Sequence, residues 1–184
     1  MSDTLNIKNF SIKFIDIMVG IVLGLGFQWW ANLRETWQFV AFIFVYLDTV
    51  DYWIDYGPAL KKFPPKKEID VFLDLAICFS LFLYIYSTQY QIMYFLAAFS
   101  LIKFFDFFWL LSSKLEYKPT HFDRIYVDTW MKVDASEVFL ALAIIPLSYL
   151  LNLSSLASLI IFIIMRLGAR IVASYNYKRI YLSN

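Results

Sequence analysis

The chain has 184 residues, of which 61% are hydrophobic and 21% aromatic, and its mean hydropathy is +0.62. A soluble domain is about 45–50% apolar and about 25% charged, whereas only 17% of these residues are charged. A small globule cannot hide so many apolar side chains from water, so the composition excludes an ordinary soluble domain. A single cysteine and a single histidine also exclude an internal disulfide, a cysteine-rich metal site and a haem held by two histidines.

Six apolar stretches follow one another along the chain, and each has about the ~20 residues that a helix needs to cross a hydrocarbon core of ~30 Å. They cover residues 12–31, 37–54, 71–87, 92–111, 134–151 and 156–173. None shows the alternation of period two that is typical of barrel strands. The sequence therefore predicts one all-α domain over residues 1–184, a multi-pass membrane bundle of six transmembrane helices.

A further short helix is predicted near residues 120–132. Thr120 and Asp123 follow Pro119 with the spacing of a helix N-terminal capping signal. Four apolar residues of this stretch share one helical face, namely Phe122, Ile125, Tyr126 and Trp130. The pattern fits either a helix that lies in the headgroup region or a solvated connecting helix.

Charged residues are concentrated on one side of the predicted bundle. The connections at 32–36, 88–91 and 152–155 hold only Arg34 and Glu35, so every other basic residue lies on the opposite side or in the helix ends that face it. By the positive-inside rule, both termini are expected to be cytoplasmic. The connection at 57–67, which a Gly-Pro pair opens, is rich in lysine, and its basic residues are Lys61, Lys62, Lys66 and Lys67. These lysines are expected to contact anionic lipid headgroups rather than nucleic acid.

The spacing of charged residues suggests three related helical hairpins. Each odd-numbered span begins near an aspartate, and each even-numbered span ends near a charged residue. In chain order the pairs are Asp16 and Asp51, Asp70 and Asp106, and Asp134 and Arg170. The intervals between corresponding residues agree within one residue, which indicates duplication unless helix ends on this side simply attract charge.

Five carboxylates occur where the second predicted helix ends and the third begins. Asp48, Asp51 and Asp55 are three and four residues apart, and Asp70 and Asp74 are four apart, so each set can share one helical face. Carboxylates that meet in a hairpin repel unless they are protonated, paired or bound to a cation. Oxygen ligands without histidine or cysteine suit Mg²⁺ or Mn²⁺ rather than zinc. The alternative is that the acids pair with basic residues from other helices, namely Lys103, Arg166 and Arg170.

The pattern Asp48-x-x-Asp51 followed by Asp70-x-x-x-Asp74 resembles the acidic motif of CDP-alcohol phosphotransferases. That family has six helices, and its motif lies across helices 2 and 3. The resemblance rests on the spacing of the acids, because the glycines and the Ala-Arg pair of the family are replaced here. It implies that Asp48, Asp51 and Asp70 hold a divalent metal, and that Asp74 is the base that activates the alcohol.

Arg166 and Arg170 are one helical turn apart in the sixth predicted helix. They could bind the phosphate or carboxylate of a headgroup, or they could pair with acids inside the bundle. Lys103 and Asp106 are three residues apart in the fourth helix and are expected to pair with each other.

Three functions follow from these patterns. The first is an enzyme at the cytoplasmic leaflet that uses a divalent cation to transfer a lipid or its headgroup. The second is an accessory subunit of a larger membrane complex or homo-oligomer. The third is a cation or proton channel or transporter that uses the intramembrane acids, although helices 3 and 6 offer little polar lining in the half of the bundle with the short connections.

Overall fold

The computed structural model describes the backbone of residues 2–176 and the side chains of residues 13–175. Within this range the secondary structure consists of helices only. The elements are α1 (Ser2–Gly26), a 3₁₀ helix η1 (Phe27–Asn32), α2 (Thr36–Lys62), α3 (Glu68–Ser87), α4 (Ile92–Tyr117), α5 (His121–Leu150) and α6 (Ser155–Asn176). The prediction of an all-α bundle with six long helices is confirmed.

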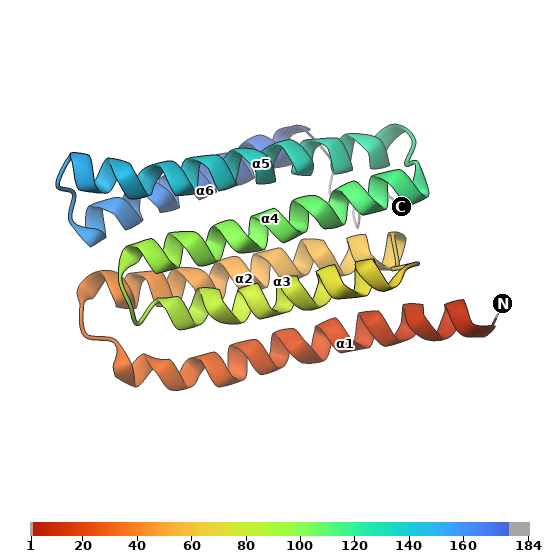
Figure 1. Cartoon of the computed structure of the whole chain (residues 1–184), viewed down its shortest axis with the longest axis horizontal. Coiled ribbons are helices and arrows are strands. Elements are labelled where there is room, and N and C mark those ends of the chain that lie inside the picture. The colour runs from red at the N-terminus through yellow and green to blue at the C-terminus, as the bar shows by residue number, and fades with distance from the viewer. Residues whose placement is uncertain (1, 177–184) are drawn as a thin grey trace.

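The helices run along the long axis of the molecule and alternate in direction, so that they form three successive hairpins (Figure 1). The connections at 33–35, 88–91 and 151–154 lie together at one end, which we call the short-loop end. The connections at 63–67 and 118–120 lie at the opposite end, where α1 begins and toward which α6 runs. We call this second end the basic end. The predicted duplication of the hairpins remains a prediction.

Five of the described helical segments are long and apolar enough to cross a membrane. They are Lys13–Asn32, Glu68–Ser87, Ile92–Tyr117, His121–Leu150 and Ser155–Tyr175. The exception is α2, which carries three aspartates in its central part. Because α2 connects the short-loop end of α1 to the basic end of α3, it nevertheless runs the length of the bundle (Figure 1). The chain is therefore a multi-pass integral membrane protein.

The second helix is longer than the sequence predicts. A loop was expected from Gly57, but α2 continues through Pro58 to Lys62. A proline inside a helix removes one hydrogen bond and is tolerated where neighbouring groups satisfy the backbone. The next two residues, Ala59 and Leu60, are almost fully buried, so packing favours continuation of the helix. The helix ends at Lys62, and its C-cap residue Phe63 comes just before the Pro64-Pro65 pair.

The short helix predicted near 120–132 is not a separate element. The segment is helical, but α5 runs without interruption from His121 to Leu150. The first turns of α5 are therefore a continuous helical extension of the fifth span. The prediction failed because charged residues such as Asp128 and Lys132 are typical of the end of a membrane span. In the structure these residues are helical, and the helix continues into the apolar turns that follow.

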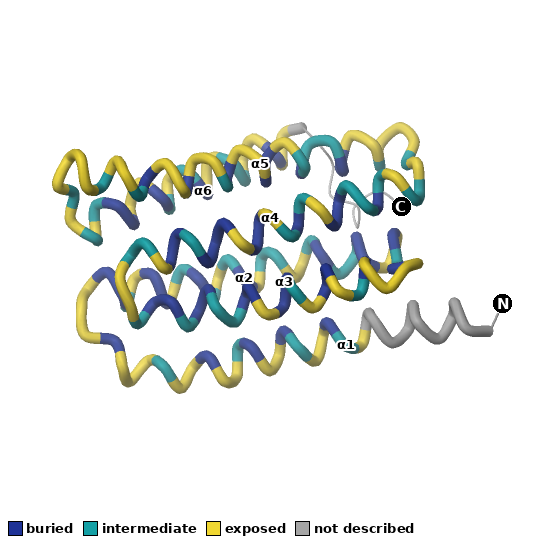
Figure 2. Tube along the Cα trace, viewed as in Figure 1, coloured by how far each residue is buried: buried dark blue, intermediate teal, exposed yellow. Residues whose placement is uncertain are grey.

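The core lies along α3 and α4, and α4 packs most extensively against α5 and α3. Burial is densest in these inner helices, whereas α1, α5 and α6 expose one side (Figure 2). Large apolar side chains on the outer faces, such as Ile17, Phe139 and Ile164, are exposed. Extended exposed apolar surface of this kind is typical of a membrane-facing protein.

Candidate functional site

Lys103, in the middle of α4, is a buried cation surrounded by carboxylates. Lys103 is only 2% exposed to solvent. Its Nζ lies 3.0 Å from Asp134 Oδ1, 3.4 Å from Glu137 Oε2 and 3.9 Å from Asp106 Oδ2. Asp134 and Glu137 are three residues apart on α5, so one face of that helix presents both acids to the lysine. The predicted pairing of Lys103 with Asp106 is therefore its longest contact rather than its main one.

Arg166, in α6, extends this cluster to a third helix and, through Asp48 of α2, to a fourth. Its Nη1 donates to Glu137 Oε1 over 2.8 Å, and its Nε donates to Asp48 Oδ1 over 2.9 Å. The guanidinium carbon also lies 5.7 Å from the centre of the Phe99 ring. Glu137 thus joins the lysine and the arginine. We refer to the six residues Lys103, Arg166, Asp48, Asp106, Asp134 and Glu137 as the central network.

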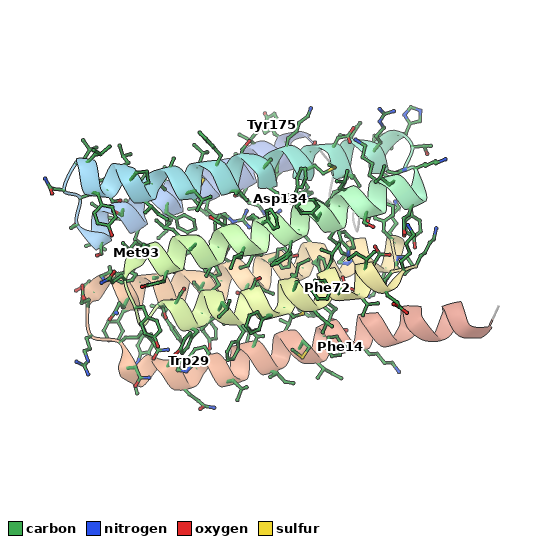
Figure 3. The ribbon with its side chains drawn as sticks, viewed as in Figure 1. Phe14, Trp29, Phe72, Met93, Asp134 and Tyr175 are labelled. Atoms are coloured by element: carbon green, nitrogen blue, oxygen red, sulfur yellow. The ribbon has the colours of Figure 1, made fainter. Side chains whose placement is uncertain are left out.

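The central network lies near the middle of the bundle, as the labelled Asp134 illustrates (Figure 3). With a rise of 1.5 Å per residue, Lys103 and Arg166 each lie roughly 16 Å from the short-loop end of their helices. This is close to half of a ~30 Å hydrocarbon core. Ionisable side chains at this depth are costly and are by default candidates for function.

The charges of the central network do not balance. It contains four carboxylates and two cationic side chains, which leaves an excess of two carboxylates. Asp134 and Glu137 are completely buried, and Asp134 Oδ2 makes no hydrogen bond within the described part of the chain. An unpaired ionised carboxylate is strongly disfavoured away from water. The excess must therefore be met by protons or by a cation.

Arg170 forms a second cluster one turn nearer the basic end. Its Nε lies 2.8 Å from Asp51 Oδ2, its Nη1 contacts Asp55, and its guanidinium carbon lies 5.2 Å from the Trp130 ring centre. Of the two roles predicted for Arg166 and Arg170, the structure shows ion pairing with Asp48, Asp51 and Asp55. Binding of a headgroup by these arginines remains a prediction.

The other two predicted site residues lie elsewhere, on α3. Asp70 Oδ2 accepts hydrogen bonds from the backbone N–H groups of Lys66 and Lys67, and its Oδ1 accepts one from Ser112. It therefore caps the start of α3, as an acid at the third helical position does in a capping box. Asp74 Oδ1 accepts a hydrogen bond of 2.5 Å from the hydroxyl of Tyr56.

The four predicted acids thus have separate partners. Asp48 and Asp51 contact arginines of α6, whereas Asp70 and Asp74 contact groups near the start of α3. Among the described residues, no three His, Cys, Asp or Glu side chains are grouped as metal ligands. The metal role of Asp48, Asp51 and Asp70, and the role of Asp74 as a base, remain predictions.

Three of the four predicted lipid-binding lysines contact groups of the protein itself. Lys62 pairs with Asp123, Lys66 Nζ lies 3.7 Å from the Tyr117 ring centre, and Lys67 Nζ lies 2.6 Å from Glu116. The hydrogen bond with the Glu116 carboxylate, together with its charge, raises the pKa of Lys67. These contacts join the connection at 63–67 to the neighbouring ends of α4 and α5.

Two polar cavities lie on either side of the central network. The basic-end cavity has about 30 Å³ of room for the centres of water molecules, and it is lined by Tyr52, Tyr56, Lys103, Asp106, Arg166 and Arg170, among others. A cavity of this size can hold at least one water.

The short-loop pocket, beside the labelled Met93 (Figure 3), measures about 580 Å³. Its polar lining includes Glu35, Gln38, Gln89, Gln91, Ser148 and Ser155. The polar residues of this pocket come from α2, α5, the connections and Ser155, the first residue of α6.

An aromatic cluster separates the short-loop pocket from the central network. It consists of Phe44, Phe95, Phe99 and Phe162. The Phe162 ring centre lies 5.3 Å from that of Phe95, 4.8 Å from that of Phe99 and 5.9 Å from that of Phe44. Such edge-to-face packing stabilises the contact beyond the effect of burial alone.

The sequence analysis missed Glu137. The sequence did contain a signal for it, because Glu137 is an acid three residues after Asp134 and is followed by a long apolar stretch. An acid within a membrane span predicts a functional or paired role.

In comparisons with known proteins, no family model matches the chain, and neither the curated proteins nor the solved structures give a significant match.

Proposed function

We propose that this membrane protein moves protons across the bilayer, and that the central network is the site at which they bind. The observation that supports this proposal is the excess of two buried carboxylates over the cations Lys103 and Arg166. A proton can neutralise a buried carboxylate without the additional space that a metal cation would need. Chains of acidic groups at this depth are typical of proton relays in pumps and transporters.

The arrangement of cavities supports a path through the network. The basic-end cavity reaches Lys103 and Asp106 from one side. A smaller cavity beyond the network is lined by Thr49, Tyr84 and Phe99, and the aromatic cluster then separates it from the short-loop pocket. In this proposal the basic-end cavity forms one part of the path, and the aromatic cluster interrupts the path on the short-loop side. A transporter that exposes its site to one side at a time has this property.

We further propose that the basic end faces the cytoplasm, as the positive-inside rule predicts. In a Cys78→Ala background, a membrane-impermeant maleimide added to intact cells should label Arg34→Cys and Leu153→Cys. It should label Lys62→Cys and Lys118→Cys only after the membrane is permeabilised. Labelling of position 62 or 118 in intact cells would contradict this orientation.

Proton movement can be measured directly in proteoliposomes. Purified protein is reconstituted with a pH-sensitive dye inside the vesicles, and valinomycin with a potassium gradient imposes a membrane potential. We expect dye responses above those of protein-free vesicles. Glu137→Gln should reduce the rate at least tenfold, because one of the carboxylates that exchange protons is removed.

The matched control is Glu68→Gln, which makes the same chemical change at an exposed glutamate that begins α3. Its rate should equal that of the wild type. Asp134→Asn provides a second test within the network if the first variant folds poorly. Absence of flux in the folded wild type, or flux that is indifferent to both network variants, would overturn the proposal.

A further inference from the structure

Asp74 is a buried acid that lies outside the central network. Its residue is 2% exposed, and it forms no ion pair in the described part of the chain. One oxygen accepts the hydrogen bond from Tyr56. The Trp109 indole N–H also faces the carboxyl group, but Oδ2 makes no hydrogen bond of normal geometry among the described residues. A buried carboxyl group with an unused oxygen requires an explanation, because leaving such a group unsatisfied is costly.

Two tyrosines of α2 connect Asp74 to the central network. Tyr56 donates its hydroxyl hydrogen bond to Asp74 on α3, and Tyr52 donates one over 3.2 Å to Asp106 Oδ1 on α4. The two rings are stacked, with centres 5.3 Å apart and planes inclined by 19°. Both tyrosines line the basic-end cavity. The two hydroxyl groups therefore border one small polar space that can hold water.

The acids along this line lie at increasing depth from the basic end. At 1.5 Å per residue, Asp70 lies about 3 Å, Asp74 about 9 Å and Asp106 about 16 Å from the ends of their helices. Asp70 caps the first turn of α3 beside the connection at 63–67. Asp74 is one turn farther in, and Asp106 belongs to the network. Successive carboxyl groups thus lead from the membrane boundary toward the middle of the bundle.

We infer that Asp74 and Tyr56 form the entry route by which protons reach the central network from the basic end. When Asp74 takes up a proton, it becomes the donor in its hydrogen bond with Tyr56, and the phenolic O–H of Tyr56 turns to a water molecule in the cavity. Asp74 then passes its proton to the Tyr56 oxygen while the phenolic proton moves to that water. That water passes a proton to Tyr52, whose own phenolic proton moves to Asp106. Each intermediate oxygen gains one proton as it loses one, so the net result is transfer from Asp74 to Asp106.

The inference rests on the proposed proton movement and is tested with the same proteoliposomes. Tyr56→Phe removes one oxygen and keeps the ring, so the fold should survive while the flux falls at least tenfold. Asp74→Asn should reduce the flux to the same extent, and Asp74→Glu should restore a measurable part of it. Thermal melts of each variant in detergent establish that the protein used is folded.

Two control variants make the same chemical changes away from the route. Tyr46→Phe removes a hydroxyl of α2 that donates to the Leu23 carbonyl oxygen, and Asp16→Asn neutralises an acid that accepts from Trp53 on the exposed side of α1. Both should keep the flux of the wild type. If Tyr56→Phe and Asp74→Asn keep wild-type flux while Glu137→Gln loses it, the entry route is wrong and the proposed function stands. If the wild type moves no protons, both are overturned.

Discussion

Replacing Arg166 with alanine should lower the free energy of unfolding by about 3–5 kcal/mol, the range found when one partner of a buried ion pair is removed. The guanidinium contacts both Glu137 and Asp48 and is only 3% exposed. Its loss would leave Lys103 as the one cation of the central network against four carboxylates. Thermal or denaturant unfolding in detergent micelles, followed by circular dichroism, measures the change.

The double variant Arg166→Ala with Glu137→Gln should recover part of this loss, because it also removes a carboxylate that the first change leaves unpaired. Arg124→Ala is the control. Its side chain is 66% exposed and pairs with Asp128 over 3.5 Å, and such surface pairs contribute only about 0–1 kcal/mol. An Arg166→Ala protein as stable as the control would show that the network does not depend on this arginine.

The sequence correctly predicted the features of the fold that depend on composition and on the local spacing of residues. The number of long helices, their alternation and the concentration of charge at one end followed from apolar stretches of membrane-spanning length. The boundaries were less accurate. Gly57 and Pro58 lie inside α2 because the residues after them are buried, and residues 120–132 belong to α5. Both errors arose where tertiary packing continued a helix through residues that locally favour its end.

The partners of the acids could not be predicted from spacing. Asp48 and Arg166 are 118 residues apart in the chain, and Asp51 and Arg170 are 119 apart, so their pairing depends on α6 packing against α2. The spacing of Asp48, Asp51, Asp70 and Asp74 matches a family motif. The structure nevertheless gives these acids three different environments, namely ion pairs with α6, a helix cap and a tyrosine hydrogen bond.

Replacing Phe162 with alanine should open the closed side of the proposed path and raise the proton flux about tenfold, which corresponds to ~1.4 kcal/mol of barrier. Phe162 is fully buried and its ring contacts those of Phe44, Phe95 and Phe99. Its removal leaves a void between the small cavity at Tyr84 and the short-loop pocket. Water that enters this void would connect the two.

The same substitution should also lower the free energy of unfolding by about 3–5 kcal/mol, as is usual when a buried phenylalanine becomes alanine. Phe162→Leu separates the two effects, because it keeps most of the apolar volume; its flux should remain close to that of the wild type. Phe79→Ala, at a ring that is 62% exposed on α3, controls for the loss of an aromatic side chain. Proteoliposomes at equal protein content give the comparison. A folded Phe162→Ala protein with wild-type or lower flux would mean that the aromatic cluster is a structural core and does not close a path.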